Sequence, residues 1–227
     1  TQPIELSGLA KDFRTNQFQI TGLINSKLLD SYDSSLGIYG QISYNRSNLY
    51  LDDKELPNIV PDLIRKPQNG YIKLGLDASK INQQSIHNGR IFISQALSTV
   101  IPNEQQQSLE SIGIKPKQAR AIGASLDNLF AFNNGIRVKA SLAAQKALAP
   151  LVGSMRFQVG ADSGLLGLPG SIASGDSGLQ LNAEGFVPIA AISGWNLGLK
   201  PFAGFASLST ETPLGERSNN VGAAGAM

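Results

Sequence analysis

Apolar or small side chains occupy every second position in several stretches of this chain, separated by residues that favour turns. The clearest stretch is 136–142, in which four apolar residues alternate with Arg137, Lys139 and Ser141; the same pattern recurs at 18–20, 38–44, 72–76 and 90–94. Because successive side chains of a strand point to opposite faces, this pattern predicts half-buried β-strands. The 24 glycines and 11 prolines provide many turn sites. The sequence therefore predicts an all-β, β-dominated fold.

Strand spacing and turn residues favour a β-sandwich or a jelly-roll-like barrel with one or two inserted helices. We expect a single β-rich domain over 1–218, with a helical insertion near 103–132. Asn103 to Ser111 forms one expected helix, and Pro116 to Phe130 forms the other because its apolar residues recur at spacings of three and four. The residues 219–227 have little to bury and are expected to form a C-terminal arm or a disordered tail.

The chain has no cysteine and a single histidine, His87. Disulfides and thiolate metal sites are therefore impossible, and neither a metal nor a cofactor is expected. The longest apolar run, from Phe186 to Trp195, is interrupted and falls short of the roughly 20 residues that a spanning helix needs. No transmembrane helix is expected. The first residues lack the features of an uncleaved signal peptide.

Positive charge is concentrated in one part of the chain, although the formal net charge is only +2. Residues 111–156 hold seven Lys and Arg against one acid, whereas residues 157–227 are net negative. A basic segment can contact a polyanion, an acidic surface of a neighbouring copy, or only solvent. The candidate residues for binding nucleic acid or a partner are Lys115, Lys117, Arg120, Arg137 and Lys139.

The sequence Gly175-Asp176-Ser177-Gly178 is the one stretch that suggests reaction chemistry. It is followed by two apolar runs and by Ser193-Gly194-Trp195, and the whole resembles the nucleophile segment of trypsin-like serine proteases. The resemblance implies Ser177 as nucleophile, and chain order would permit His87 as its general base and Asp127 as the third member of a triad. Leu179 and Gln180 stand where that family usually has Gly and Pro. The alternative interpretation is a hairpin turn, because Gly, Asp and Ser are turn formers.

A second stretch, Leu109 to Ile122, resembles a helix-hairpin-helix, with Gly113 and Ile114 at the hairpin. The resemblance implies contact with the DNA backbone. Lys115 occupies the place of that motif's second glycine. An ordinary packed helix pair is the alternative.

We predict a structural, self-assembling subunit, such as a virion coat, tail or other particle protein, and not an enzyme. The chain lacks a complete set of catalytic groups, its C-terminal third is rich in small residues, and its basic and acidic regions can pair between copies. The expected partners are copies of itself. The expected location is a virion or other extracellular particle, with a cytoplasmic stage before assembly. A serine protease that uses Ser177 and a nucleic-acid-binding protein that uses 115–156 are the alternatives.

Overall fold

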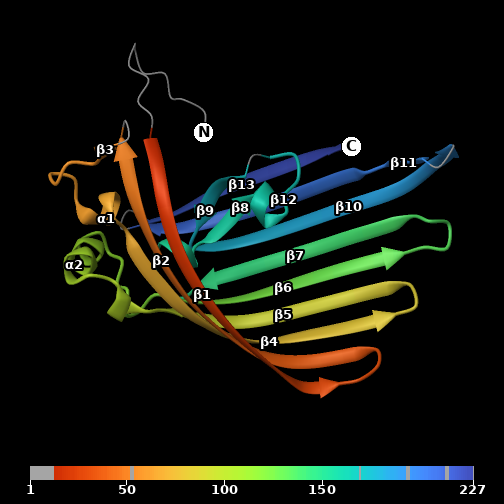
Figure 1. The fold of residues 1–227 in the computed structure, drawn as a ribbon, viewed down its shortest axis with the longest axis horizontal. Coiled ribbons are helices and arrows are strands. Elements are labelled where there is room, and N and C mark those ends of the chain that lie inside the picture. Colours follow the sequence, from red (N-terminus) through yellow and green to blue (C-terminus); the bar gives the residue numbers. More distant parts are fainter. Residues whose placement is uncertain (1–12, 52–53, 169, 193–194, 213–214, 227) are drawn as a thin grey trace, which may run out of the picture.

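The chain forms one large antiparallel β-sheet with two short helices at one end (Figure 1). The structure is a computed structural model and describes residues 13–51, 54–168, 170–192, 195–212 and 215–226. The all-β prediction is therefore confirmed in its general form. A β-sandwich or jelly roll is not confirmed, because every long strand lies in a single sheet and only a small two-stranded ladder stands apart from it.

The strands of the large sheet follow one another in space as they do in the sequence, in the order β1-β2-β4-β5-β6-β7-β10-β12-β13. Every neighbouring pair is antiparallel. The bounds are β1 (Phe13–Asp30), β2 (Ser34–Leu51), β4 (Gln68–Asn82), β5 (Ser85–Ala96), β6 (Arg120–Ala131), β7 (Arg137–Ala147), β10 (Ser177–Ile192), β12 (Pro201–Thr212) and β13 (Gly215–Ala226); β3 (Lys54–Glu55) pairs with β2, and β11 (Trp195–Leu199) with β10.

The connections at the two ends of the sheet differ in length. At one end, 31–33, 83–84 and 132–136 join their strands tightly; at the other, the chain forms α1 (Asp62–Arg65), the 3₁₀ turn η1 (Ser98–Val100) and α2 (Asn103–Ser111). Buried residues of this second end form a core cluster: Ala96, Ile101, Leu109, Ala119, Ala121, Ala147, Leu151, Val152 and Met155. Among the described residues, no helix is long and apolar enough to cross a membrane.

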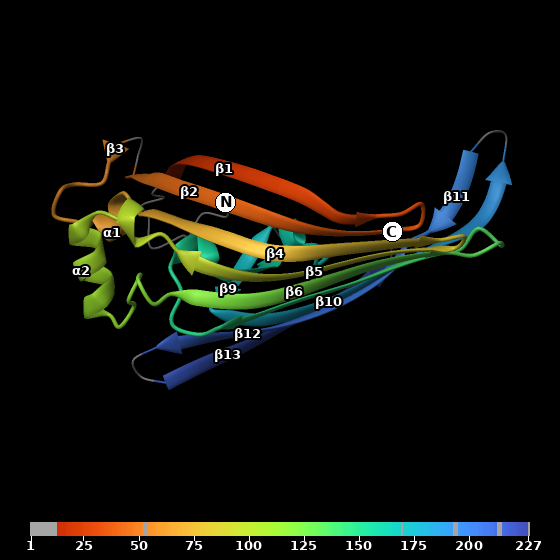
Figure 2. The ribbon, with the colours of Figure 1, turned by 90° about the horizontal axis from the view of Figure 1, so that it is seen from below.

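One connection, described over residues 148–168 and 170–176, lies against a face of the sheet; we call it the inner segment. It contains η2 (Gly153–Met155), β8 (Phe157–Gly160), η3 (Ala161–Ser163) and β9 (Ser171–Gly175). Val159 and Leu165 pack with Ala206 and Leu208 of β12 in a second core cluster. The sheet is curled, and β8 and β9 lie on its concave side (Figure 2).

The structure corrects the predicted second helix and the predicted tail. The segment from Pro116 to Phe130 is not a helix: residues 120–131 form β6, paired on both sides with β5 and β7. Ile122, Leu126 and Phe130 are four residues apart, a spacing that also places them on one face of a strand. Residues 219–226 lie in β13 rather than in an arm, and Met227 is outside the described residues. The expected helix at Asn103–Ser111 is present as α2.

Two glycines allow aromatic rings to lie flat across the sheet. A Cβ added to Gly75 would stand 2.6 Å from the Tyr39 ring and 2.2 Å from the Ile91 carbonyl oxygen, and one added to Gly123 would stand 2.3 Å from Phe92. All three distances are far below contact distance, so only glycine fits at these two positions. Tyr39, Gly75, Phe92 and Gly123 follow one another across β2, β4, β5 and β6, and the rings pack on backbone instead of on side chains.

Candidate functional site: the two faces of the curved sheet

The convex face of the sheet presents large apolar side chains from strand after strand. Adjacent strands pair so that these residues fall on the same side, as Ile38, Leu76 and Ile91 do in β2, β4 and β5. They remain exposed: Ile24 is 78% exposed and Ile91 56%. We call this surface the apolar face; it comprises Ile20, Ile24, Ile38, Ile42, Leu74, Leu76, Ile91, Ile93, Ile122, Leu126, Leu179, Leu181 and Phe205.

The alternate positions of the same strands form the opposite, polar face. Its polar members include Gln41, Ser43, Lys73, Asp77, Arg90, Ser94, Ser125, Gln145, Gln180 and Asn182. The inner segment covers part of this face: Gln180 Nε2 donates to the Ser163 carbonyl oxygen at 2.7 Å, and Gln145 Nε2 donates to that of Met155 at 2.9 Å. The sheet is therefore polar toward its concave side and apolar toward its convex side.

Two cations on the polar face lie beside aromatic rings. Lys73 Nζ stands 4.3 Å from the centre of the Phe92 ring, and the Arg90 guanidinium carbon stands 5.0 Å from that of Tyr39. The quadrupole of each ring attracts the cation and stabilises its position. Tyr39 is only 5% exposed. These contacts hold positive charge on the concave side.

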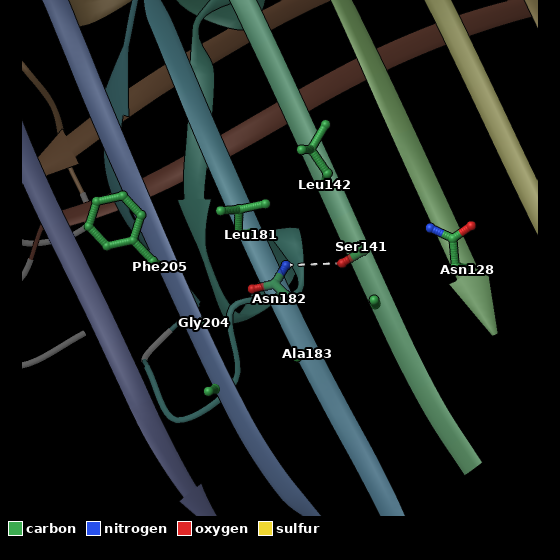
Figure 3. A pocket seen from close by; sticks show the side chains of 10 residues that line it. Asn128, Ser141, Leu142, Leu181, Asn182, Ala183, Gly204 and Phe205 are labelled. Carbon is green, nitrogen blue, oxygen red and sulfur yellow. Dashed lines mark hydrogen bonds between the residues drawn. The ribbon is translucent and has the colours of Figure 1, made fainter. Parts of the chain in front are cut away.

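The apolar face is hollowed where small side chains replace large ones. A groove of about 450 Å³ lies over β7, β10 and β12. Leu142, Leu181 and Phe205 stand in one row across these strands at its side (Figure 3). Alanines at 140, 183 and 203 form the next row and leave the space open. Beneath it, Asn182 Nδ2 donates to Ser141 Oγ at 3.3 Å.

Gly175-Asp176-Ser177-Gly178 anchors the inner segment to the sheet. Asp176, 3% exposed, accepts hydrogen bonds from the backbone N–H groups of Leu151 at 3.2 Å and Glu211 at 3.0 Å, and its carboxylate lies 3.5 Å from Arg156. Ser177 Oγ accepts a hydrogen bond from the Ala147 N–H at 2.9 Å. Both side chains are occupied in holding the end of β7, the inner segment and β12 together.

The structure does not bring the proposed triad together. His87 lies in β5 and Ser177 in β10, with β6 and β7 between them. His87 bonds instead to Asn128 Oδ1 at 2.7 Å and to Ser85 Oγ at 3.0 Å. Asp127 is on the polar face, whereas His87, paired with Asn128, is on the other face. The motif's residue types match a protease, but their placement does not.

The five basic candidate residues also divide into two groups. Lys115 and Lys117 precede β6, and Arg120 begins it, donating to Gln95 of β5. Arg137 and Lys139 lie at the far end of β7, about ten residues and roughly 33 Å along the strands. Lys139 lies 3.7 Å from Glu184. The five do not form one patch. Self-association and nucleic-acid contact stay predictions.

Comparison with known proteins gives a match of fold. The chain is similar to CdiB from Escherichia coli, with a TM-score of 0.71 and 14% identity, over 99% of this chain and 41% of that one. It is also similar to CdiB from Acinetobacter baumannii, with a TM-score of 0.63 and 16% identity, over 96% of this chain and 40% of that one. The chain thus spans about two fifths of these proteins. No protein-family profile matches it, and no curated protein matches its sequence.

The prediction of a virion or particle subunit, and of a particle location, is wrong. Two structures that share this fold across nearly the whole chain are CdiB proteins from bacteria, and neither is a coat, capsid or tail protein. The small residues of the C-terminal third, which suggested close packing between copies, lie in β10, β12 and β13 of the sheet.

The apolar face, as a candidate functional surface, was not predicted from the sequence. Its signal was present: alternation extends over strands of 11 to 18 residues, separated by turn residues. Strands of globular proteins are usually about 5–6 residues long. The length of the alternating stretches, together with the alternation itself, would have predicted strands long enough to form such a face.

Proposed function

We propose that this chain forms part of the membrane-spanning wall of a bacterial outer-membrane β-barrel transporter, of the TpsB/Omp85 type that CdiB represents. The observation that carries the proposal is the apolar face, which extends from β1 to β12 with residues on seven strands, while Leu142 of β7 stands in the same row as Leu181. Soluble monomers rarely expose an apolar patch larger than about 600 Å². In a bilayer the same face contacts hydrocarbon at no cost.

Strand length and topology support the same function. A strand that crosses the bilayer needs about 9–11 residues, and the shortest strand on the main path, β7, has 11. Outer-membrane barrels consist of antiparallel neighbours with apolar and polar residues in alternation, short turns at one end and longer loops at the other. The sheet follows these rules with one exception: β12 and β13 are separated by only two residues at the end where the other connections are longer.

The two edge strands of the sheet, β1 and β13, bear on whether the sheet closes into a barrel. Within the described ranges, β1 and β13 each pair along one edge only. Backbone groups in hydrocarbon must be hydrogen-bonded, so a sheet in a bilayer has no free edges. We infer that this sheet is an arc of a barrel that further strands complete. Its polar face then lines the interior, in which the inner segment lies.

Membrane integration tests the proposal. We expect the chain to float with phosphatidylcholine vesicles in a density gradient and to remain with them through washes in high salt and in carbonate at high pH, because the apolar face is buried in the bilayer and not held by charge. Release of the chain by either wash would contradict the proposal. The control is the chain kept unfolded in denaturant and mixed with the same vesicles, which should not float with them.

A further inference from the structure

A second groove on the apolar face ends at a cation. It has a volume of about 650 Å³ and lies over β4 to β7. Large side chains, among them Leu76, Ile91 and Ile122, border it, and the small Ala124 and Ala144, paired with each other, leave the space between them. Lys146 lines one end. The groove is therefore apolar along its length and positive at its limit.

One more cation, Arg120, lies diagonally across from Lys146, and the backbone of a third, Lys117, lies beside Gln95. Lys146 pairs with Ile122 across β6 and β7, and Arg120 lies two residues from Ile122 on the same face, a diagonal separation of roughly 7–8 Å. The Gln95 side chain, which accepts from Arg120, donates to the Lys117 carbonyl oxygen at 3.3 Å. Lys117, Arg120 and Lys146 are all exposed. Within the described ranges, none of the three is ion-paired with a carboxylate.

These cations stand at the border of the apolar face. Beyond them the strands end and the chain enters the connections that hold α2 and the inner segment, where Leu148 and Ile112 are further exposed apolar residues. Lys and Arg at such a border place their stems along apolar surface and their charges at the level of lipid headgroups. The arrangement matches an amphiphile with an apolar chain and an anionic head.

We propose that this groove binds a phosphate-bearing anionic lipid, with an acyl chain along Leu76, Ile91 and Ile122 and the phosphate at Arg120 and Lys146, assisted by Lys117. The arginine guanidinium can donate two parallel hydrogen bonds to a phosphate. The inference rests on the proposed function, because it requires the apolar face to lie in a bilayer. The proposed site would also assign a lipid phosphate as the partner of three cations of the basic segment 111–156.

Native mass spectrometry of the detergent-solubilised chain tests this site. The probes are dimyristoylphosphatidylglycerol, dimyristoylphosphatidylcholine and inorganic phosphate. We expect tighter retention of phosphatidylglycerol than of phosphatidylcholine. The triple variant Lys117→Gln, Arg120→Gln, Lys146→Gln should lower phosphatidylglycerol affinity by about a hundredfold, roughly fivefold for each cation, and leave phosphatidylcholine affinity unchanged. Inorganic phosphate should bind far more weakly, because it leaves the groove empty.

The matched control is the double variant Arg137→Gln, Lys139→Gln, which removes cations from the polar face at the other end of β7. It should bind phosphatidylglycerol as the unchanged chain does. Equal lipid affinity in the triple variant and the unchanged chain would overturn the inference, as would an equal loss in the control. These outcomes are independent of vesicle flotation: a chain that floats but lacks this lipid preference retains the proposed function and loses only the site.

Discussion

Ile91→Arg is expected to lower the free energy of unfolding from a bilayer by about 2–4 kcal/mol, the cost of an arginine facing lipid near the midplane. Ile91 is exposed on the apolar face, with Leu76 and Ala124 beside it on the neighbouring strands. Its replacement places a charge in hydrocarbon without a partner. Urea unfolding of the chain in phosphatidylcholine vesicles, followed by fluorescence of its single tryptophan, measures the loss.

Asn88→Arg is the matched control for that prediction. Asn88 is three residues away in the same strand, is also exposed, and lies on the polar face. There an arginine meets water, so the unfolding free energy should change by less than about 0.5 kcal/mol. A chain in which both substitutions cost the same would contradict the assignment of the two faces.

Asp176→Ala is expected to release the inner segment from the sheet, at a cost of about 3 kcal/mol. The carboxylate accepts from the Leu151 and Glu211 N–H groups and faces Arg156. Its removal leaves two backbone donors without their partner, and each costs about 1–3 kcal/mol when buried; Arg156 keeps its hydrogen bond to Thr210. A loss of this size raises the population of the opened segment more than a hundredfold. Limited trypsin cleavage at Arg156 measures that population.

Asp162→Ala serves as its control, because Asp162 lies in the same segment but is exposed. Cleavage at Arg156 should proceed at the rate of the unchanged chain. If Asp176→Ala also left this rate unchanged, Asp176 would not be the anchor of the inner segment.

Local pattern predicted the strands but not their surroundings. The alternation at 136–142 and 72–76 corresponds to β7 and β4, because the two-residue period is a property of the strand itself. The prediction of a helix over 116–130 was wrong because apolar residues four apart lie on one face of a helix and also on one face of a strand. Only the pairing of β6 with β5 and β7, which involves residues distant in sequence, distinguishes them.

Predicting the apolar face and the polar face as candidate functional surfaces required the same long-range information. The alternation predicts that one side of β5 carries Ile91 and Ile93 and that the other side carries Arg90 and Ser94. It does not predict which of the two sides is covered by other parts of the chain. In a soluble sandwich the apolar side is buried; here the inner segment lies on the polar side. The Gly175 to Gly178 motif likewise has the residue types of a protease nucleophile segment. In the folded chain, however, its side chains bind backbone N–H groups and hold the inner segment to the sheet.

The most direct test of a lipid-facing convex side is a cysteine scan of β6, since the chain has no cysteine of its own. Single variants at Ile122, Ala124 and Leu126, and at Ser125 and Asp127 on the opposite face, are labelled with an environment-sensitive fluorophore in vesicles. We expect blue-shifted emission, quenched by nitroxide lipids, at 122, 124 and 126, and water-accessible emission at 125 and 127. Equal emission and equal quenching at Leu126→Cys and Asp127→Cys would contradict this prediction.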